Sequence, residues 1–127
     1  MCAVGAMRTE VHTRRPFGAD EEDVAGWRVL KVWGEVDAGM AGLLSTLVVY
    51  AVRRGARNVC LDLTELDRVD RGGVEALRRC QLAAGFEGGR LAVIRPGDPV
   101  VAEVLENSGV RRFVKLLARR EQLMAGA

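Results

Sequence analysis

Residues 58–73, NVCLDLTELDRVDRGG, decide the fold of this chain. The first six, residues 58–63, are apolar on both faces of a strand, which is typical of a central strand in a parallel sheet. A helix is predicted from about Gly72 to Ala84, because several small or apolar residues can share one of its faces: Gly73, Ala76, Leu77, Cys80 and Ala84. Unpaired N–H groups and the helix dipole at such a start make the junction a ready anion site.

The residues before this stretch predict a second strand and a second helix. Residues 27–33 alternate between two faces as a strand does, and Gly34 is expected to end that strand. From residue 38 to about residue 54 the apolar side chains recur with the i, i+3, i+4, i+7 spacing of an amphipathic helix. Asp37 is placed to cap this helix by accepting a hydrogen bond from one of its orphan N–H groups.

The N-terminal residues carry weaker signals. Residues 7–13 alternate in polarity and predict an edge strand, antiparallel to residues 27–33. Residues 14–26 contain an acidic run at 20–23 and predict a polar loop. Residues 1–6 are expected to be disordered.

The C-terminal third continues the alternation of strands and helices. Residues 90–95 predict a buried strand, and Asp98 followed by Pro99 is a strong helix start. The inner face of that helix is expected to consist of Val101, Val104 and Leu105. A last short strand is predicted at residues 110–116, centred on Phe113, and a terminal helix at residues 117–124.

This order of elements predicts an α/β fold with a mixed, mostly parallel sheet of about five strands and about four helices. The chain has 127 residues, of which 49% are hydrophobic, and this fits one domain with a real core over residues 1–127. The sequence contains no sign of a repeat or of a second domain.

Composition argues against several classes of function. A net charge of +2, with scattered basic residues, is too mild to indicate nucleic-acid binding. No window is apolar for the ~18 residues that a membrane span needs, and the N-terminus has no apolar core of a signal peptide, so we expect a cytoplasmic protein. Cys2, Cys60 and Cys80 have no metal-binding spacing. We expect them to be small apolar fillers, and a regulatory disulfide between Cys60 and Cys80 is unsupported.

Four short motifs, in order, resemble the STAS domain family, which includes the anti-sigma factor antagonists. The resemblance spans nearly the whole chain, from about residue 7 to about residue 124. It rests on GEVD at residues 34–37, LDLT at 61–64, VD at 69–70 with Gly73, and VLENSGV at 104–110. Each motif falls on the expected element.

The loop before the predicted second helix departs from the family pattern. In the family this loop usually has the sequence Asp-Ser-Ser-Gly, and a partner kinase phosphorylates the second serine. Here Asp70 and Gly73 are kept, whereas Arg71 and Gly72 replace the two serines. Three interpretations follow: an antagonist that its kinase cannot switch off, a module with a different partner that Arg71 contacts, or a drifted scaffold in which Arg71 is merely exposed.

The resemblance implies a non-enzymatic binding module that binds an anti-sigma factor with an ATPase or kinase fold and thereby releases a sigma factor. It implies no cofactor, no metal, no direct contact with nucleic acid and no membrane partner, and it leaves a homodimer open. The residues expected to contact the partner lie at the carboxyl edge of the sheet: Glu35, Asp37, Thr64, Asp70, Arg71, Gly72 and Gly73.

Other functions find less support in the residues. The chain lacks the dinucleotide-binding and P-loop motifs, and its single histidine, His12, falls in the weak first strand. Asp62, Asp67 and Asp70 could suggest a receiver domain, but Arg95 occupies the neighbourhood where a receiver has a lysine. Two further alternatives within the family stay open: a subunit of a stress-signalling or transporter-associated assembly, and a module that binds a small ligand.

Overall fold

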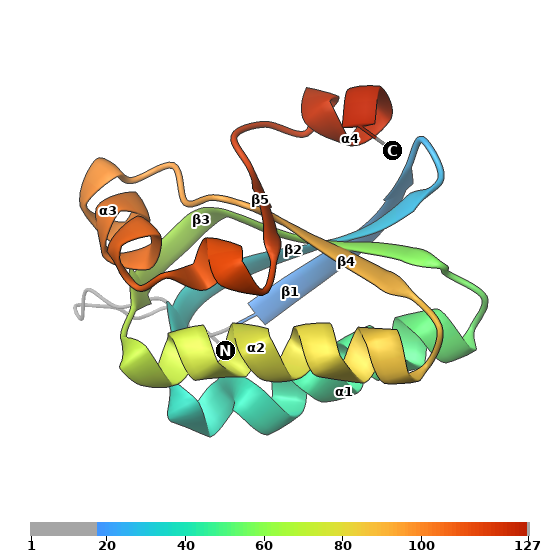
Figure 1. Ribbon diagram of the computed structural model, residues 1–127, viewed down its shortest axis with the longest axis horizontal. Helices are drawn as coiled ribbons and strands as arrows, with labels where there is room; N and C mark the ends of the chain where they lie inside the picture. Colours follow the sequence, from blue (N-terminus) through green and yellow to red (C-terminus); the bar gives the residue numbers. More distant parts are fainter. Residues whose placement is uncertain (1–17, 127) are drawn as a thin grey trace, which may run out of the picture.

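The central strand is longer than the sequence predicts. In the computed structural model, which describes residues 18–126, this strand spans Asn58–Val69 and is joined by four others in a five-stranded sheet (Figure 1). The sheet has the order β1-β2-β3-β4-β5; β1 is antiparallel to β2, and the other neighbours are parallel. This confirms the predicted α/β fold. The strands are β1 Gly18–Val24, β2 Trp27–Val36, β3 Asn58–Val69, β4 Arg90–Ile94 and β5 Lys115–Leu117.

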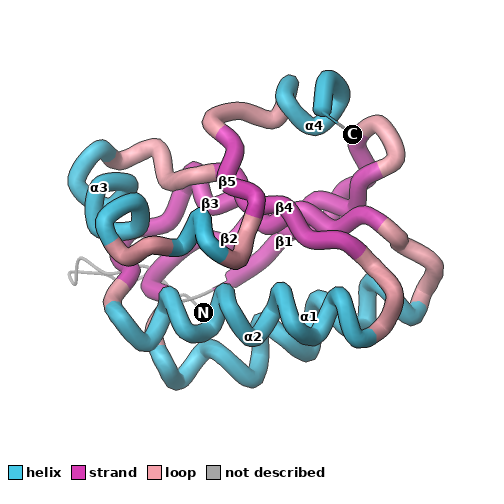
Figure 2. The backbone as a smooth tube through the Cα atoms, in the orientation of Figure 1, coloured by secondary structure: helices cyan, strands magenta, loops and turns pink. Residues whose placement is uncertain are grey.

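Helices lie on both faces of this sheet. Helices α1 and α2 run side by side under one face, whereas α4 lies over the other and α3 stands at one end (Figures 1 and 2). Two 3₁₀ turns, η2 and η3, precede α1 and β5. The helical elements are η2 Ala38–Met40, α1 Ala41–Arg53, α2 Arg71–Phe86, α3 Pro99–Asn107, η3 Val110–Arg112 and α4 Glu121–Gly126.

The small-residue face of α2 is confirmed. Its buried residues are the five that the sequence indicates: Gly73, Ala76, Leu77, Cys80 and Ala84. All but Gly73 pack with α1 against one face of the sheet in the larger core cluster. Asp98 caps α3 as predicted, because its carboxylate accepts hydrogen bonds from the N–H groups of Val100 and Val101, with Pro99 in the first turn.

The other face of the sheet has its own smaller core, in which Leu123 of α4 covers strand residues such as Trp27 and Cys60. Cys60 and Cys80 therefore lie on opposite faces of the sheet and cannot approach to disulfide distance. Burial raises the pKa of each thiol to about 12, so both stay protonated, as inert fillers do.

A buried ion pair also holds this second face. Asp62 of β3 is 2% exposed, and its Oδ2 accepts a hydrogen bond of 2.8 Å from Nε of Arg120, just before α4. Its Oδ1 accepts from the N–H and the hydroxyl of Thr64, at 2.9 and 2.7 Å. Arg120 also contacts Glu22 of β1, at 3.2 Å. Three separate parts of the chain thus meet over this face.

The loop predicted at residues 14–26 is wrong for residues 18–24, which form β1. This strand lies at the edge of the sheet, where charged side chains can reach water and protect the edge from further pairing. Two of its acidic residues, Glu21 and Asp23, bind the guanidinium of Arg28 on β2, at 2.7 and 2.5 Å. The strand predicted at residues 7–13 and the disorder predicted at residues 1–6 lie outside the described residues.

Gly34 does not end β2, which continues to Val36. Gly34 has a φ of 94°, and the register with β3 shifts between Gly34 and Glu35. Such a bulge lets the strand continue past an irregular residue. β3 also continues beyond residue 63, and pairs with β2 as far as Val69.

The C-terminal predictions need correction in detail. Val104 is 44% exposed, so only Val101 and Leu105 form the buried face of α3. Residues 110–112 form a 3₁₀ turn after Gly109, whose φ is 81°, and Phe113 caps that turn instead of lying in a strand. The last strand is only three residues long, and the last helix begins four residues later than predicted.

Among residues 18–126, no helix combines the length and the apolar character that would let it span a membrane.

Candidate functional site

Two aspartates lie next to each other where neighbouring strands of the sheet end. β2 and β3 are parallel and end in register, with Val36 opposite Val69, so the next residues, Asp37 and Asp70, lie at the same edge. Both have extended backbones, with φ of −134° and −121°, and both occupy the N-cap position of the helical element that follows. The parallel sheet therefore brings together two residues that are far apart in the sequence.

The two carboxylates are used differently. Asp70 accepts a hydrogen bond of 2.8 Å from the N–H of Gly73 and so caps α2. Asp37 takes the predicted cap position, but its side chain makes no capping bond, so that part of the prediction is wrong. Its Oδ1 is buried and has no hydrogen-bond partner within residues 18–126. An unpaired buried oxygen is costly unless something binds it.

Gly72 and Gly73 allow α2 to start very close to the end of β2. A Cβ atom at position 72 would lie 2.6 Å from the backbone nitrogen of Ala38, and one at position 73 would lie 2.3 Å from the carbonyl oxygen of Val36. Both contacts are with backbone, which cannot move aside as a flexible side chain can. The site therefore requires glycine at both positions.

A small cleft of about 100 Å³ lies at the ends of β2 and β3. It is lined by acidic and basic groups together with two valines: Glu35, Val36, Asp37, Arg68, Val69 and Asp70. The structure thus brings together three of the residues predicted from sequence, Glu35, Asp37 and Asp70. Among the described residues, no group of three or more acidic, histidine or cysteine side chains is arranged to hold a metal ion.

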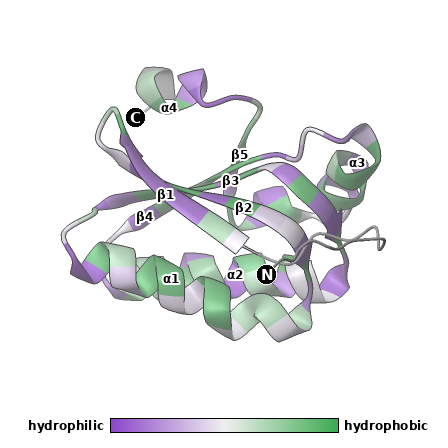
Figure 3. Ribbon diagram, turned by 180° about the vertical axis from the view of Figure 1, so that it is seen from behind, coloured by the Kyte–Doolittle hydropathy of each residue, from purple (hydrophilic) through white to green (hydrophobic). Residues whose placement is uncertain are grey.

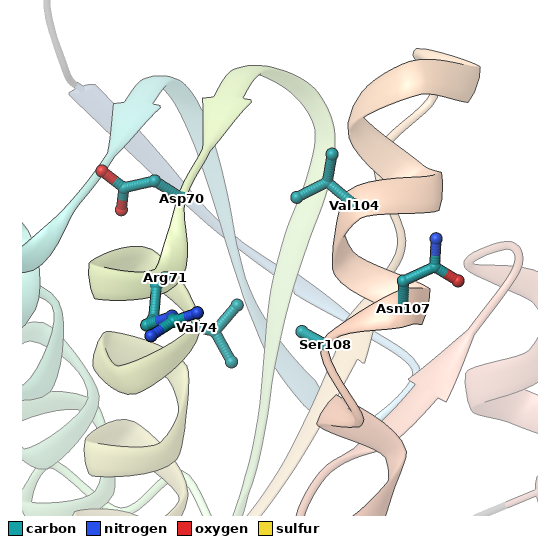
Figure 4. Close-up of a pocket in the computed structure, with 6 residues that line it drawn as sticks. All are labelled: Asp70, Arg71, Val74, Val104, Asn107 and Ser108. Atoms are coloured by element: carbon teal, nitrogen blue, oxygen red, sulfur yellow. The ribbon is translucent and has the colours of Figure 1, made fainter.

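A larger groove of about 540 Å³ lies between the first turn of α2 and the C-terminal half of α3. Figure 4 shows Arg71 and Val74 on one side of it and Val104 and Asn107 on the other. Val74 and the exposed Val104 give it an apolar centre. The complete lining is Asp70, Arg71, Val74, Val104, Asn107 and Ser108.

Arg71 is exposed at the start of α2 and forms no hydrogen bond or ion pair with any residue in the described range 18–126. Glu75, four residues after Arg71, pairs instead with Arg78, at 3.5 Å. A cation near a helix N-terminus is mildly unfavourable. Arg71 is therefore a free positive charge beside an apolar groove.

Thr64 does not join these residues. It lies inside β3, five residues before Val69, which at ~3.3 Å per residue places it ~16 Å from the strand end. Its hydroxyl is bound to Asp62, and its carbonyl oxygen accepts a hydrogen bond from the N–H of Gly97. The prediction that Thr64 shares the cluster of Asp37 and Asp70 is wrong in position, because β3 does not end at residue 63.

Sequence reasoning missed the contribution of α3 to the site. Val104 was expected in the core, and neither Asn107 nor Ser108 was considered beyond a helix end. The sequence does place polar residues one helical turn after Val104, which could have indicated an exposed face. Only the packing of α3 shows that this face is the exposed one. The Ser108 hydroxyl donates to the carbonyl oxygen of Leu105, at 2.5 Å.

Comparisons with known proteins agree with this fold. A family model described as "Mlab, STAS domain" matches residues 21–118. None of the curated proteins compared with the chain matches it.

Solved structures of anti-sigma factor antagonists share the fold. One from Mycobacterium paratuberculosis has a TM-score of 0.71 at 20% identity, over 87% of this chain and 92% of that one. Unphosphorylated SpoIIAA, also an anti-sigma factor antagonist, has a TM-score of 0.61 at 19% identity, over 85% and 93% of the two chains. Phosphorylated SpoIIAA from Bacillus has a TM-score of 0.56 at 19% identity, over 87% and 97%.

Proposed function

The chain belongs to the STAS domain family, and from this premise we propose that it is an anti-sigma factor antagonist. It binds an anti-sigma factor with a kinase-type fold and so frees a sigma factor, and it carries out no chemistry of its own. The likeness in fold to antagonists from two bacterial groups supports the general role. The contact surface is the carboxyl edge of β2 and β3 together with the α2–α3 groove.

The observation that carries this proposal is the packing of Gly72. In the family, phosphate on the loop serine adds nearly two negative charges and ejects the antagonist. Gly72 has no hydroxyl, and a Cβ there would press on the backbone of Ala38, so the loop offers its kinase no serine and has no room for one. The proposed antagonist therefore has no phosphorylation switch in this loop.

Arg71 and the groove supply the contacts that the proposal needs. A free guanidinium at the rim suits a carboxylate of the partner, since a charge-assisted pair is stronger than a neutral one. The apolar centre between Val74 and Val104 can receive one apolar side chain. Asp37 lines the neighbouring small cleft together with Glu35 and Asp70, where its carboxylate can accept from a donor of the partner.

The test is calorimetric binding to the kinase-type anti-sigma factors of the source organism, with and without ATP. Wild type is expected to bind equally well in both conditions, and intact mass after incubation with ATP should show no phosphate. Arg71→Glu should weaken binding at least tenfold, which corresponds to about 1.4 kcal/mol. Arg119→Ala, at another exposed arginine, is the matched control and should bind as wild type does.

The binding outcomes that contradict the proposal are specific. Binding that ATP abolishes, together with phosphate on the chain by intact mass, would refute the missing switch. No binding to any of these anti-sigma factors would refute the antagonist role and favour a subunit of a stress-signalling or transporter-associated assembly.

A further inference from the structure

The outward faces of α1 and α2 carry large apolar side chains that nothing in the described chain covers. Tyr50 is 58% exposed, Leu82 61% and Phe86 90%. Figure 3 shows α1 in front, coloured as hydrophobic over much of its length, in contrast to the hydrophilic β1. Exposed apolar groups that gather on one face, unlike isolated ones, indicate an interaction surface.

A groove runs between these two helices on the same face. Its volume is about 290 Å³, and its apolar lining residues are Val49 and Tyr50 of α1 and Ala83 of α2. The complete lining is Ser45, Thr46, Val49, Tyr50, Arg53 and Ala83. A shallow apolar groove between two packed helices can receive the apolar stripe of a third helix.

The charges that remain unpaired around this groove are positive. Helix α1 contains no acidic residue. The acids of this region are already used, because Glu87 binds Arg53 at 3.0 Å and Glu75 binds Arg78. Two arginines then remain: Arg54, whose guanidinium lies 5.2 Å from the centre of the Tyr50 ring, and Arg79, which has no partner in the described range 18–126.

We infer that the α1–α2 face is a second docking surface, for an acidic amphipathic helix of a partner protein. The apolar stripe of that helix lies over Val49 and Ala83 and covers Leu82 and Phe86. Its carboxylates pair with Arg54 and Arg79. This surface is distinct from the carboxyl edge of the sheet, and the inference does not depend on the proposed function.

The same charges disfavour the other two occupants. A second copy docked through this face would bring arginines against arginines, since the acids are already paired. An anionic lipid surface would also be attracted to these cations, but as a continuous sheet of negative charge it would meet the carboxylates of Glu75 and Glu87 on this face. A helix can place its acids at the two free arginines and avoid both carboxylates.

The experiment is an NMR titration of the full chain with two synthetic helical peptides. Both carry the same leucine stripe; one has glutamates beside the stripe and the other has lysines there. The acidic peptide is expected to shift the amide resonances of Thr46, Val49 and Ala83, and to bind at least tenfold more tightly than its basic twin, a difference of about 1.4 kcal/mol.

Variants locate the contact. Arg79→Glu and Phe86→Ser should each weaken binding of the acidic peptide about tenfold. The matched controls are Arg119→Glu and Val100→Ser, because Arg119 is an exposed arginine elsewhere and Val100 is 69% exposed on α3. Both controls should leave binding unchanged.

Three results would overturn the inference. The first is that neither peptide, or both equally, shifts these resonances. The second is sedimentation with phosphatidylglycerol vesicles, but not with phosphatidylcholine vesicles, that Phe86→Ser abolishes. The third is a concentration-dependent dimer that the same variant dissociates. The last two would assign the face to a lipid surface or to a second copy.

Discussion

Asp62 lies within β3 and Asp37 directly follows the neighbouring strand β2, yet the two carboxylates have opposite surroundings. Asp62 is 2% exposed, and both of its oxygens are bound, one by Thr64 and the other by Arg120. Asp37 has a buried oxygen without a partner. At the same edge, Arg71 follows Asp70 at the start of α2 and is a cation without a partner in the described range. The second face of the sheet has a closed polar network, whereas at the edge the Asp37 Oδ1 and the Arg71 guanidinium have no partner among residues 18–126.

This difference distinguishes side chains that stabilise the fold from side chains that are available to bind a partner. A buried carboxylate that is fully hydrogen-bonded stabilises the fold and is unavailable to other molecules. Unpaired groups at an edge do not stabilise the fold, and an exposed one such as the Arg71 guanidinium can gain an ion pair from a partner. Polarity alone does not mark the site; the absence of an internal partner does.

Removal of Arg120 should have the largest effect on stability. Arg120→Ala leaves the Asp62 carboxylate buried without its countercharge, and we expect the free energy of unfolding to fall by about 3 kcal/mol. Urea denaturation measures this. Arg119→Ala, at the exposed neighbour, should change stability by less than about 0.5 kcal/mol. If the two variants changed stability equally, the ion pair between Asp62 and Arg120 would not stabilise the fold in the way described.

Acid should remove part of the same stabilisation. Burial alone would raise the pKa of Asp62, but the hydrogen bonds from Thr64 and Arg120 outweigh it and hold this pKa below its ordinary value. The stability from this group is therefore present above the unfolded pKa of about 3.9 and is lost as the pH falls through the lower folded pKa. When the pH is lowered from neutral to below the unfolded pKa of Asp62, the free energy of unfolding should fall more for wild type than for Arg120→Ala. The same denaturation measured over pH tests this, and parallel curves would contradict it.

The edge can be tested at Gly72. Gly72→Ser brings a Cβ against the backbone of Ala38, and we expect a loss of about 2 kcal/mol from overpacking. Thermal and urea unfolding give the value, with Gly42→Ser as the control because a Cβ at Gly42 would meet no atom within 4 Å. A stable Gly72→Ser protein would show that a phosphoacceptor could occupy this position after all.

The smallest effect is expected at Arg71. Arg71→Ala removes an unpaired cation from the start of α2, so stability should change by no more than about 0.5 kcal/mol, towards stabilisation. Urea denaturation, together with the binding assay, separates the two roles. A substantial loss of stability would place Arg71 in the folded structure and remove it from the recognition surface.

Local patterns predicted much of the fold and about half of the site. The small-residue face of α2 and the cap at Asp98 follow from spacing and local hydrogen bonding, and both are confirmed. The strand at residues 18–24 was missed because a run of acidic side chains is more typical of a loop than of a strand. Thr64 was misplaced because the end of a strand depends on how long its neighbour continues to pair with it.

The sequence by itself determined the alternation of strands and helices, the helix caps, the glycines at the α2 junction and the absence of a hydroxyl at Gly72. Only the tertiary structure decided which charges are neutralised and which stay free. Asp62 meets a guanidinium 58 positions away, and Arg71 meets none among the described residues. The physical reason is that spacing governs contacts within one element, whereas an ion pair or a groove depends on how distant elements pack.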